Sequence, residues 1–141
     1  MAQPATTEAD TLSIAVVGAH LTGLPLNHEL TGQGGRLVKR SRTAGDYRLF
    51  ALPNTSPPKP GLLREPGCAG PGLEVEVWTL PPDAFGRFVA KIPAPLGIGK
   101  VALEDGTSVS GFLCEAHALR GAEDITRFGG WRAFLAGQST S

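Results

Sequence analysis

The sequence has few cysteines, no excess charge of either sign and no long apolar run, and each absence excludes a class of protein. Its two cysteines, Cys68 and Cys114, are far apart and lack a metal-binding spacing, so we expect reduced thiols. The 13 basic and 13 acidic residues cancel, which argues against nucleic acid or anionic lipid as a partner. No stretch approaches the roughly 20 apolar residues of a membrane helix, and the start of the chain lacks the pattern of a signal peptide. We therefore expect a cytoplasmic protein with no membrane partner.

Most motifs that carry catalysis are also missing. The chain has no phosphate-binding Gly-x-x-x-x-Gly-Lys-Ser/Thr loop, no His-Glu-x-x-His, no Cys-x-x-Cys and no Gly-x-Ser-x-Gly. The three histidines, His20, His28 and His117, are scattered along the chain. The sequence therefore predicts neither a metal site nor a cofactor.

Composition and the spacing of turn residues predict a single α+β domain. The 141 residues suffice for one core, and 41% of them are apolar. The 19 glycines and 12 prolines are spread along the chain, which is typical of short elements joined by tight turns. We expect a small mixed β-barrel of about six strands, with a few short helices covering its mouth. The domain should span residues 10–136, with disordered polar tails at 1–9 and 137–141.

Apolar runs, alternation and turn residues place the elements of this domain. Strands are expected at residues 12–17, 36–43, 47–52, 73–80, 100–103 and 109–114, the last two joined by the hairpin signal Asp105-Gly106. Helices are expected at 24–30, 81–88 and 125–135, the last broken at Gly129-Gly130. The Pro-rich stretch 53–71 and the apolar stretch 92–99 should be loops.

Two side-chain clusters have both a structural and a functional interpretation. An aromatic stripe at a spacing of three favours a lid over the core rather than a ligand box: Phe128, Trp131 and Phe134. A basic cluster is typical of a solvated strand face, although it could also be an anion-steering patch beside a site: Arg36, Lys39, Arg40 and Arg42.

The turn Gly18-Ala19-His20 is the candidate for a small-molecule pocket. It directly follows an apolar strand, and a strand that ends in a glycine turn before a helix exposes several backbone N–H groups at once. Such a group of donors binds a carboxylate or an oxyanion. A lone histidine is more often structural, so the residues alone leave both roles of His20 open.

The motifs around this turn resemble known families. Gly18-Ala19-His20-Leu21 occupies the place of the strand-to-loop Tyr-Gly-Ser-Leu motif of γ-glutamylcyclotransferase-like proteins. Over residues 12–136 the chain is more similar to the C-terminal domain of allophanate hydrolase. The segments that carry this similarity are 17–27, Pro57-Pro58-Lys59-Pro60-Gly61-Leu62, Ile92-Pro93-Ala94-Pro95-Leu96-Gly97-Ile98-Gly99, 109–115 and 124–131.

The resemblance implies a γ-glutamylcyclotransferase-like fold and a role in urea and allophanate degradation. In the full enzyme an amidase domain removes ammonia from allophanate, and the C-terminal domain is thought to decarboxylate the product, N-carboxycarbamate. The amidase, with its Ser–Ser–Lys machinery, is absent from these 141 residues. We therefore expect a small anionic substrate and a separate amidase as partner.

Decarboxylation suits the residues of the turn. Loss of CO2 from nitrogen requires a proton on that nitrogen, so we assign His20 as the catalytic proton donor. The remaining carboxylate needs fixed donors, and Arg48 and Lys59 are candidate cations, although each such residue is more often a surface charge. The stretch 92–99 should form an apolar wall that a ligand approaches closely at its glycines. The expected substrate-binding residues are Gly18, Ala19, Leu21, Asn27, Arg48, Lys59, Pro95 and Gly97.

Two other functions stay open at this point. The domain could be a non-catalytic module that binds a small anion or docks an amidase, because spontaneous decarboxylation of such a product is plausible. A cyclotransferase is disfavoured, because those enzymes place a catalytic glutamate after the short helix. The corresponding segment here, Lys91-Ile92-Pro93-Ala94-Pro95-Leu96, contains no acid, so we predict no release of 5-oxoproline.

Overall fold

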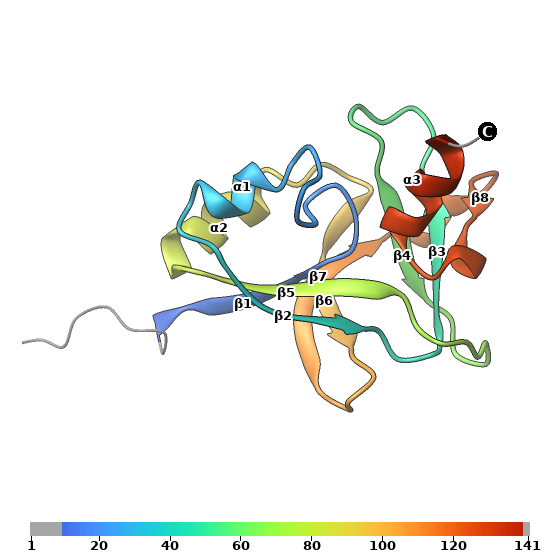
Figure 1. Cartoon of the computed structure of the whole chain (residues 1–141), viewed down its shortest axis with the longest axis horizontal. Coiled ribbons are helices and arrows are strands. Elements are labelled where there is room, and N and C mark those ends of the chain that lie inside the picture. The colour runs from blue at the N-terminus through green and yellow to red at the C-terminus, as the bar shows by residue number, and fades with distance from the viewer. Residues whose placement is uncertain (1–9, 140–141) are drawn as a thin grey trace, which may run out of the picture.

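Two β-sheets and three α-helices make up the part of the chain that the computed structural model describes, residues 10–139 (Figure 1). The large sheet has the strand order β2-β5-β1-β7-β6, and the small sheet has the order β4-β3-β8. The strands are β1 Leu12–Val16, β2 Arg36–Arg42, β3 Tyr47–Ala51, β4 Pro60–Arg64, β5 Glu74–Leu80, β6 Leu96–Ala102, β7 Ser108–Cys114 and β8 Glu123–Asp124. The helices are α1 His28–Thr31, α2 Pro82–Ala90 and α3 Trp131–Ser139.

The α+β class is confirmed, but a closed barrel is not. The strands of the small sheet pair only with one another in the described chain, so no ladder closes the two sheets into one barrel. The sheets touch by packing instead. A Cβ at Gly61 of β4 would lie 2.9 Å from the sulfur of Cys114 on β7, so glycine lets these two strands come close.

The strand β1 is the centre of the large sheet. It pairs antiparallel with β5 and parallel with β7, and Ile14, Ala15 and Val16 are fully buried. A continuous apolar run is what a strand covered on both faces requires. Figure 1 shows α1 and α2 side by side on one side of this sheet, whereas α3 lies next to the small sheet.

The first helix is much shorter than expected. Residues 21–27 form successive tight turns, in which the N–H of Leu24 donates to the carbonyl of Leu21 and the N–H of Asn27 donates to that of Leu24, both at 3.0 Å. Gly23, just before the expected helix, has a left-handed φ of 83°, residues 24–27 continue as turns, and α1 begins only at His28. The expectation of a helix over 24–30 is therefore wrong for its first half.

Two expected loops contain strands. β4 lies inside the Pro-rich stretch 53–71, where Pro60 is the first residue of a strand, a position that proline tolerates. β6 begins at Leu96, inside the apolar stretch 92–99. Prolines stand at or just before the start of both strands, Pro60 in β4 and Pro95 before β6, and they favoured a loop in the prediction.

The hairpin and the C-terminal helix follow the prediction. β6 and β7 pair in antiparallel register, and Gly106 in the turn between them has a φ of 90°. A 3-10 helix over Thr126–Phe128 ends at Gly129, and α3 follows and extends to Ser139, beyond the expected border of the domain. Trp131 and Phe134 are buried in the core, which confirms the lid. Residues 1–9, predicted to be disordered, lie outside the described part of the chain.

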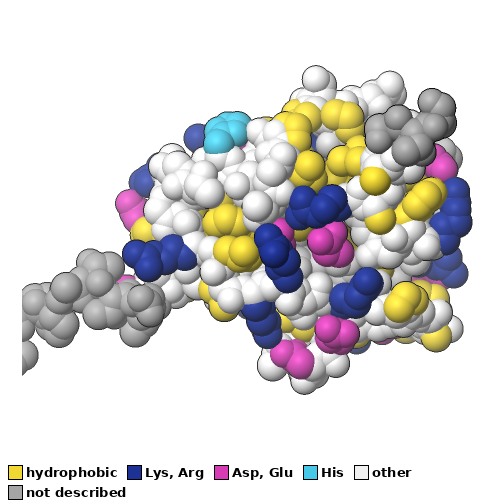
Figure 2. Space-filling view, in the orientation of Figure 1, with side chains coloured by type: hydrophobic (Ala, Val, Ile, Leu, Met, Phe, Trp, Pro, Cys, Tyr) yellow, Lys and Arg dark blue, Asp and Glu magenta, His cyan; other side chains and the backbone are white. Residues whose placement is uncertain are grey.

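The basic cluster lies on β2, an edge strand of the large sheet. Figure 2 shows Lys and Arg side chains gathered on this face, with acidic side chains between them. Lys39 Nζ lies 3.1 Å from Asp105, and Arg42 donates to the carbonyl of Gly72 at 2.8 Å. The cluster is therefore a solvated and largely paired strand face, and none of its residues lines the pocket described below.

Candidate functional site

The turn after β1 leaves two backbone N–H groups without a partner in the described chain. The N–H of Leu21 donates to the carbonyl of Gly18 at 2.9 Å, which closes a tight turn around Ala19 and His20. The N–H groups of these two central residues have no hydrogen-bond partner in the described chain, as is usual at such positions. Gly18 packs on β4, because a Cβ there would lie 2.7 Å from Cγ of Pro60.

A cavity of about 100 Å³ opens beside this turn, which suits a small ligand. Its wall combines the turn with the start of β4, the C-terminal end of α2, and the strands β6 and β7. Among the expected site residues, the structure brings together Gly18, Ala19, His20 and Lys59. The apolar wall comes from Val17, Leu26, Pro60, Phe88, Ile92, Pro93, Leu96 and Phe112.

The ring of His20 is held between two aromatic rings and one carboxylate. It stacks on Phe112 with centroids 5.2 Å apart and meets Phe88 edge-on at 5.0 Å. Its Nε2 lies 2.9 Å from Oε1 of Glu29, and only 12% of the His20 side chain is exposed. The second ring nitrogen, Nδ1, has no hydrogen-bond partner among residues 10–139.

This environment lowers the pKa of His20 below its ordinary value of 6.5. Burial is the largest cause, because it penalises the charged imidazolium, and the charges of Lys59 and His28 add to the decrease. The hydrogen bond and the charge of Glu29 act in the opposite direction. A bound anion would likewise favour the protonated ring, so binding an anion and protonating His20 reinforce each other.

Two lysines face the same cavity as His20. Lys59 precedes β4, and Lys91 directly follows α2. Neither ammonium group has a hydrogen bond or ion pair within the described chain, whereas most of the other basic side chains do. The partnered ones are Lys39, Arg40, Arg42, Arg48, Arg64, Arg87, Lys100, Arg127 and Arg132. Two lysines without a partner in the described chain and one paired carboxylate therefore line the cavity, an excess of positive charge that suits an anionic ligand.

A family model described as the allophanate hydrolase C-terminal domain matches residues 12–136. The urea amidolyase of Saccharomyces cerevisiae is 42% identical over 127 residues, which are 88% of this chain and 7% of the relative. The allophanate hydrolase of Kluyveromyces lactis superposes with a TM-score of 0.87 at 39% identity, over 94% of this chain and 22% of that one. The chain belongs to the allophanate hydrolase C-terminal domain family.

One similar solved structure is covered almost completely by the match. A uropathogenic Escherichia coli-specific protein is 35% identical, with a TM-score of 0.81, and the match covers 89% of this chain and 96% of that one. The fold alone extends further, to an aig2-like protein of Mus musculus at 17% identity and a TM-score of 0.55. The chain thus spans only a small part of the curated relatives that it matches, but nearly the whole of the bacterial one.

Two of the expected binding residues do not line the cavity but hold the turn that does. Leu21 is fully buried in the core, and its N–H is used by the turn. Asn27 does not line the cavity, but its Nδ2 donates to the carbonyl of His20 at 2.8 Å and so fixes the turn.

Arg48 lies apart from the cavity. Its guanidinium is 2.6 Å from Glu65 and 2.9 Å from Asp124, and these two partners raise its pKa. The structure therefore assigns Arg48 to an ion-pair cluster of the small sheet, and Lys59 is the candidate cation at the pocket.

The apolar stretch 92–99 contributes its first half to the pocket. Ile92, Pro93 and Leu96 line the cavity, whereas Pro95 and Gly97 do not. The missing side chain of Gly99 makes room for Leu113, whose Cδ1 would lie 2.7 Å from a Cβ there. Neither Gly97 nor Gly99 therefore lines the cavity, and close approach of a ligand to them stays a prediction.

Two pocket residues of this allophanate hydrolase C-terminal domain were missed in the sequence. Glu29 comes from α1, nine positions after His20, a spacing that predicts contact only once the tight turns between them are known. Lys91 directly follows α2. The sequence comparison expected an acid in this region of a cyclotransferase, so a lysine there could have indicated a binding site for an anion. Among residues 10–139 there is no cluster of three or more potential metal ligands and no helix long and apolar enough to cross a membrane.

Proposed function

We propose that this domain decarboxylates N-carboxycarbamate, or a similarly small carboxylated amine, in allophanate degradation. The observation that carries the proposal is the composition of the cavity: a protonatable imidazole beside two unpaired ammonium groups in a space that fits only a small ligand. N-carboxycarbamate is a dianion, so two cations match its charge. The family relationship supports the pathway, because the named relatives are urea amidolyases and an allophanate hydrolase.

The first step is binding of the dianion. Lys59 and Lys91 approach the cavity from different elements, so each can bind one carboxylate. The unpaired N–H groups of Ala19 and His20 supply fixed donors to one of these carboxylates. The stacked ring of Phe112 and the edge-on ring of Phe88 restrict the space around His20 and exclude water from the reacting nitrogen.

The chemical step transfers one proton and breaks one C–N bond. In the substrate, a single N–H nitrogen carries both carboxylates. The electron pair of the breaking bond moves to this nitrogen, which takes the proton from His20. The products are CO2 and carbamate, in which an amino group carries the one remaining carboxylate, and the imidazole is left neutral. Glu29 on Nε2 stabilises the imidazolium form, so that Nδ1 carries the proton for the substrate.

The substrate must come from an amidase. The chain corresponds to 7% of the yeast urea amidolyase and 22% of the Kluyveromyces enzyme, so those proteins contain much that this chain lacks. The proposed partner is therefore an amidase that converts allophanate to N-carboxycarbamate and releases the dianion within reach of the pocket.

A coupled assay tests the proposal. An excess of amidase generates the substrate from allophanate, and CO2 release is followed with and without the domain. His20→Ala should remove most of the acceleration, because general acid catalysis contributes about 10²–10⁴-fold. His20→Gln keeps a hydrogen-bond donor but cannot protonate the substrate, and it should be equally slow. His117→Ala, at an exposed histidine away from the cavity, is the matched control.

Two outcomes would overturn the assignment. If the His20 variants match the parent, His20 is structural. If the parent itself matches the buffer rate, the domain is the binding or assembly module considered above, and binding of malonate, a stable dianion of similar size, would then define it.

A further inference from the structure

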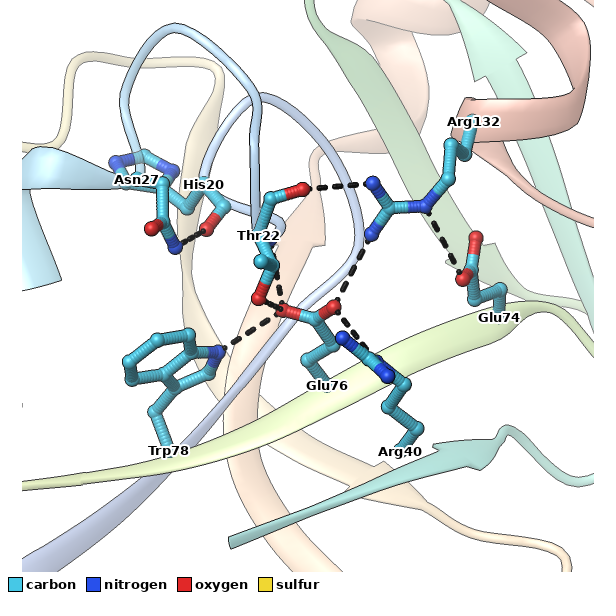
Figure 3. A network of polar contacts seen from close by, with 8 residues as sticks. All are labelled: His20, Thr22, Asn27, Arg40, Glu74, Glu76, Trp78 and Arg132. Carbon is cyan, nitrogen blue, oxygen red and sulfur yellow. Dashed lines mark hydrogen bonds and ion pairs between the residues drawn. The ribbon is translucent and has the colours of Figure 1, made fainter. Parts of the chain in front are cut away.

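A buried carboxylate lies beneath the loop that carries His20. Glu76 on β5 is 0% exposed. Its Oε1 accepts hydrogen bonds from the N–H and the hydroxyl of Thr22, both at 2.9 Å, and from Nε1 of Trp78 at 3.1 Å (Figure 3). Its Oε2 lies 3.1 Å from Arg132 and 3.4 Å from Arg40. Burial raises the pKa of Glu76, but these donors outweigh it and hold the pKa below its ordinary value, so the group is a carboxylate.

Arg132 completes the attachment of the loop. This residue of α3 donates from one NH group to the carbonyl of Thr22 at 2.7 Å and from the other to Glu76. Its Nε lies 3.4 Å from Glu74. Figure 3 shows the guanidinium between the Thr22 backbone and the two carboxylates of β5. Both backbone polar groups of Thr22 are thus bound to charged side chains, and charge-assisted bonds of this kind are short and directional.

Thr22 is two residues after His20, so this attachment acts on the turn itself. On the other side, Asn27 holds the carbonyl of His20, and the N–H of Leu26 donates to the carbonyl of Ala19 at 2.9 Å. The loop is therefore anchored to its own later turns and, through Thr22, to β5 and α3. None of Thr22, Glu76 and Arg132 lines the cavity, so they have no contact with a ligand bound there.

Stability alone is a weak reason for this arrangement. Burying the Glu76 carboxylate costs desolvation energy, and an apolar replacement of similar volume is often equally stable. What charged groups add is a single well-defined geometry. An acid catalyst requires such a geometry, because a displacement of about 1 Å can reduce a rate by about 10²-fold.

We propose that Arg132 and Glu76 are positioning residues that hold the His20 turn in its catalytic place, so that α3 controls the pocket without touching the ligand. The proposal rests on the proposed function for its kinetic effect, because it assumes that His20 acts on the substrate. Its structural effect is independent of that assumption. Without Arg132 the carbonyl of Thr22 loses its partner, and the ring of His20 leaves its position between Phe88 and Phe112 for part of the time.

The test compares Arg132→Met, Arg132→Lys and Glu76→Gln in the whole chain. Arg127→Met is the matched control, since it removes an exposed arginine of the same C-terminal segment whose ion pair, with Glu123 at 3.6 Å, lies outside the network. The ring protons of His20 are titrated by NMR, with His117 as internal reference, and malonate affinity and CO2 release are measured on the same samples.

The expected pattern separates positioning from folding. Arg132→Met should raise the pKa of His20 toward 6.5 as its ring becomes more exposed, and lower the maximal rate about 10–100-fold. The affinity for malonate should change much less, because Lys59 and Lys91 are on other elements. Arg132→Lys keeps the charge but cannot bind the Thr22 carbonyl and Glu76 together, so it should be intermediate. Arg127→Met should behave like the parent.

An unchanged titration of His20 in folded Arg132→Met would overturn the proposal. If Arg132→Met does not fold, the decision passes to Arg132→Lys and Glu76→Gln, and parent-like titration and rate in both would also overturn it. If the parent does not accelerate CO2 release, the proposed function fails. A shifted His20 titration in the variants would then still support positioning of the turn.

Discussion

The Nε2 atom of His20 lies 2.9 Å from Oε1 of Glu29. The histidine belongs to the turn after β1 and the glutamate to the short helix α1, and the tight turns between them bring both to one cavity. The glutamate is 44% exposed at its side chain, whereas the ring is largely enclosed. The pair therefore combines a solvated carboxylate with a desolvated imidazole. The pKa of His20 depends on the balance between burial of the ring, which lowers it, and Glu29, which raises it.

Glu29→Gln should shift this balance. The glutamine keeps an acceptor for Nε2 but removes the negative charge, so the pKa of His20 should fall further below 6.5. Each unit of decrease leaves about tenfold less imidazolium near neutral pH, and the rate should fall by about the same factor. An NMR titration of the ring checks the pKa. Glu115→Gln is the control, because Glu115 lies 3.8 Å from the exposed His117 outside the pocket. An unchanged His20 titration in Glu29→Gln would show that the pair has no electrostatic role.

The pH dependence of catalysis should follow His20. A general acid is active in its protonated form, which predominates below its pKa, and burial places this pKa below 6.5. The acceleration over buffer should therefore be greatest on the acidic side and fall about tenfold per pH unit above the pKa in a single-proton profile. The profile is measured with excess amidase at each pH. A rate that rises with pH through this range would identify His20 as a base instead.

Lys91→Met should weaken dianion binding. The Lys91 ammonium has no partner within the described chain, so its replacement breaks no ion pair there and removes one anchor of the ligand. Loss of one charge-assisted contact should raise the dissociation constant for malonate about tenfold, and added salt should reduce the difference. Lys100→Met serves as control, since Lys100 donates to Ser110 at 2.9 Å away from the cavity. Equal malonate affinity in Lys91→Met and parent would exclude this anchor.

No cyclotransferase activity is expected. Release of 5-oxoproline needs a base that deprotonates the α-amino group. Glu29 is the carboxylate that lines the cavity, and it is bound to His20. Incubation with γ-glutamyl amines should give no 5-oxoproline above the buffer control. Substantial product that disappears in Glu29→Gln would instead make Glu29 the base of a cyclotransferase.

Glu76 should make stability depend on acid pH. Because the folded pKa of Glu76 is lower than its ordinary value of 4.5, its contribution is complete above 4.5 and is lost as the pH falls through the folded value. Glu76→Gln should lower the free energy of unfolding by about 1.5–3 kcal/mol near neutral pH, because a neutral amide replaces the carboxylate that accepts charge-assisted hydrogen bonds from Thr22, Trp78 and Arg132. Urea unfolding at several pH values checks this, with exposed Glu104→Gln as control. A constant difference between parent and Glu76→Gln down to strongly acidic pH would contradict it.

Local patterns predicted most of the large sheet. β1 and β5 are continuous or alternating apolar runs, the residues of β2 follow the glycine pair Gly34-Gly35, and the turn Asp105-Gly106 marks the hairpin of β6 and β7. β4 was missed because its pairing with β3 is a long-range property that Pro60 at its start obscures. α1 was overextended because residues 24–27 form turns closed by i to i+3 hydrogen bonds, which an apolar spacing does not distinguish from a helix.

The pocket was only partly predictable. The turn Gly18-Ala19-His20 stands out locally, and it does line the cavity. Alternation along β5 placed Glu76 on one face but did not predict its burial, because two of its donors, Thr22 and Arg132, are 54 and 56 positions away in the chain. Such contacts depend on the packing of loop and helix on the sheet, which no local pattern contains.

The hydrogen bond from Arg132 to the carbonyl of Thr22 joins positions 110 residues apart. During synthesis, the turn after β1 leaves the ribosome long before the helix that fastens it. Until α3 emerges, Glu76 lacks one of its guanidinium partners and the His20 turn lacks its outer support. A chain that ends before α3 therefore carries all the residues of the pocket without the support that holds its histidine.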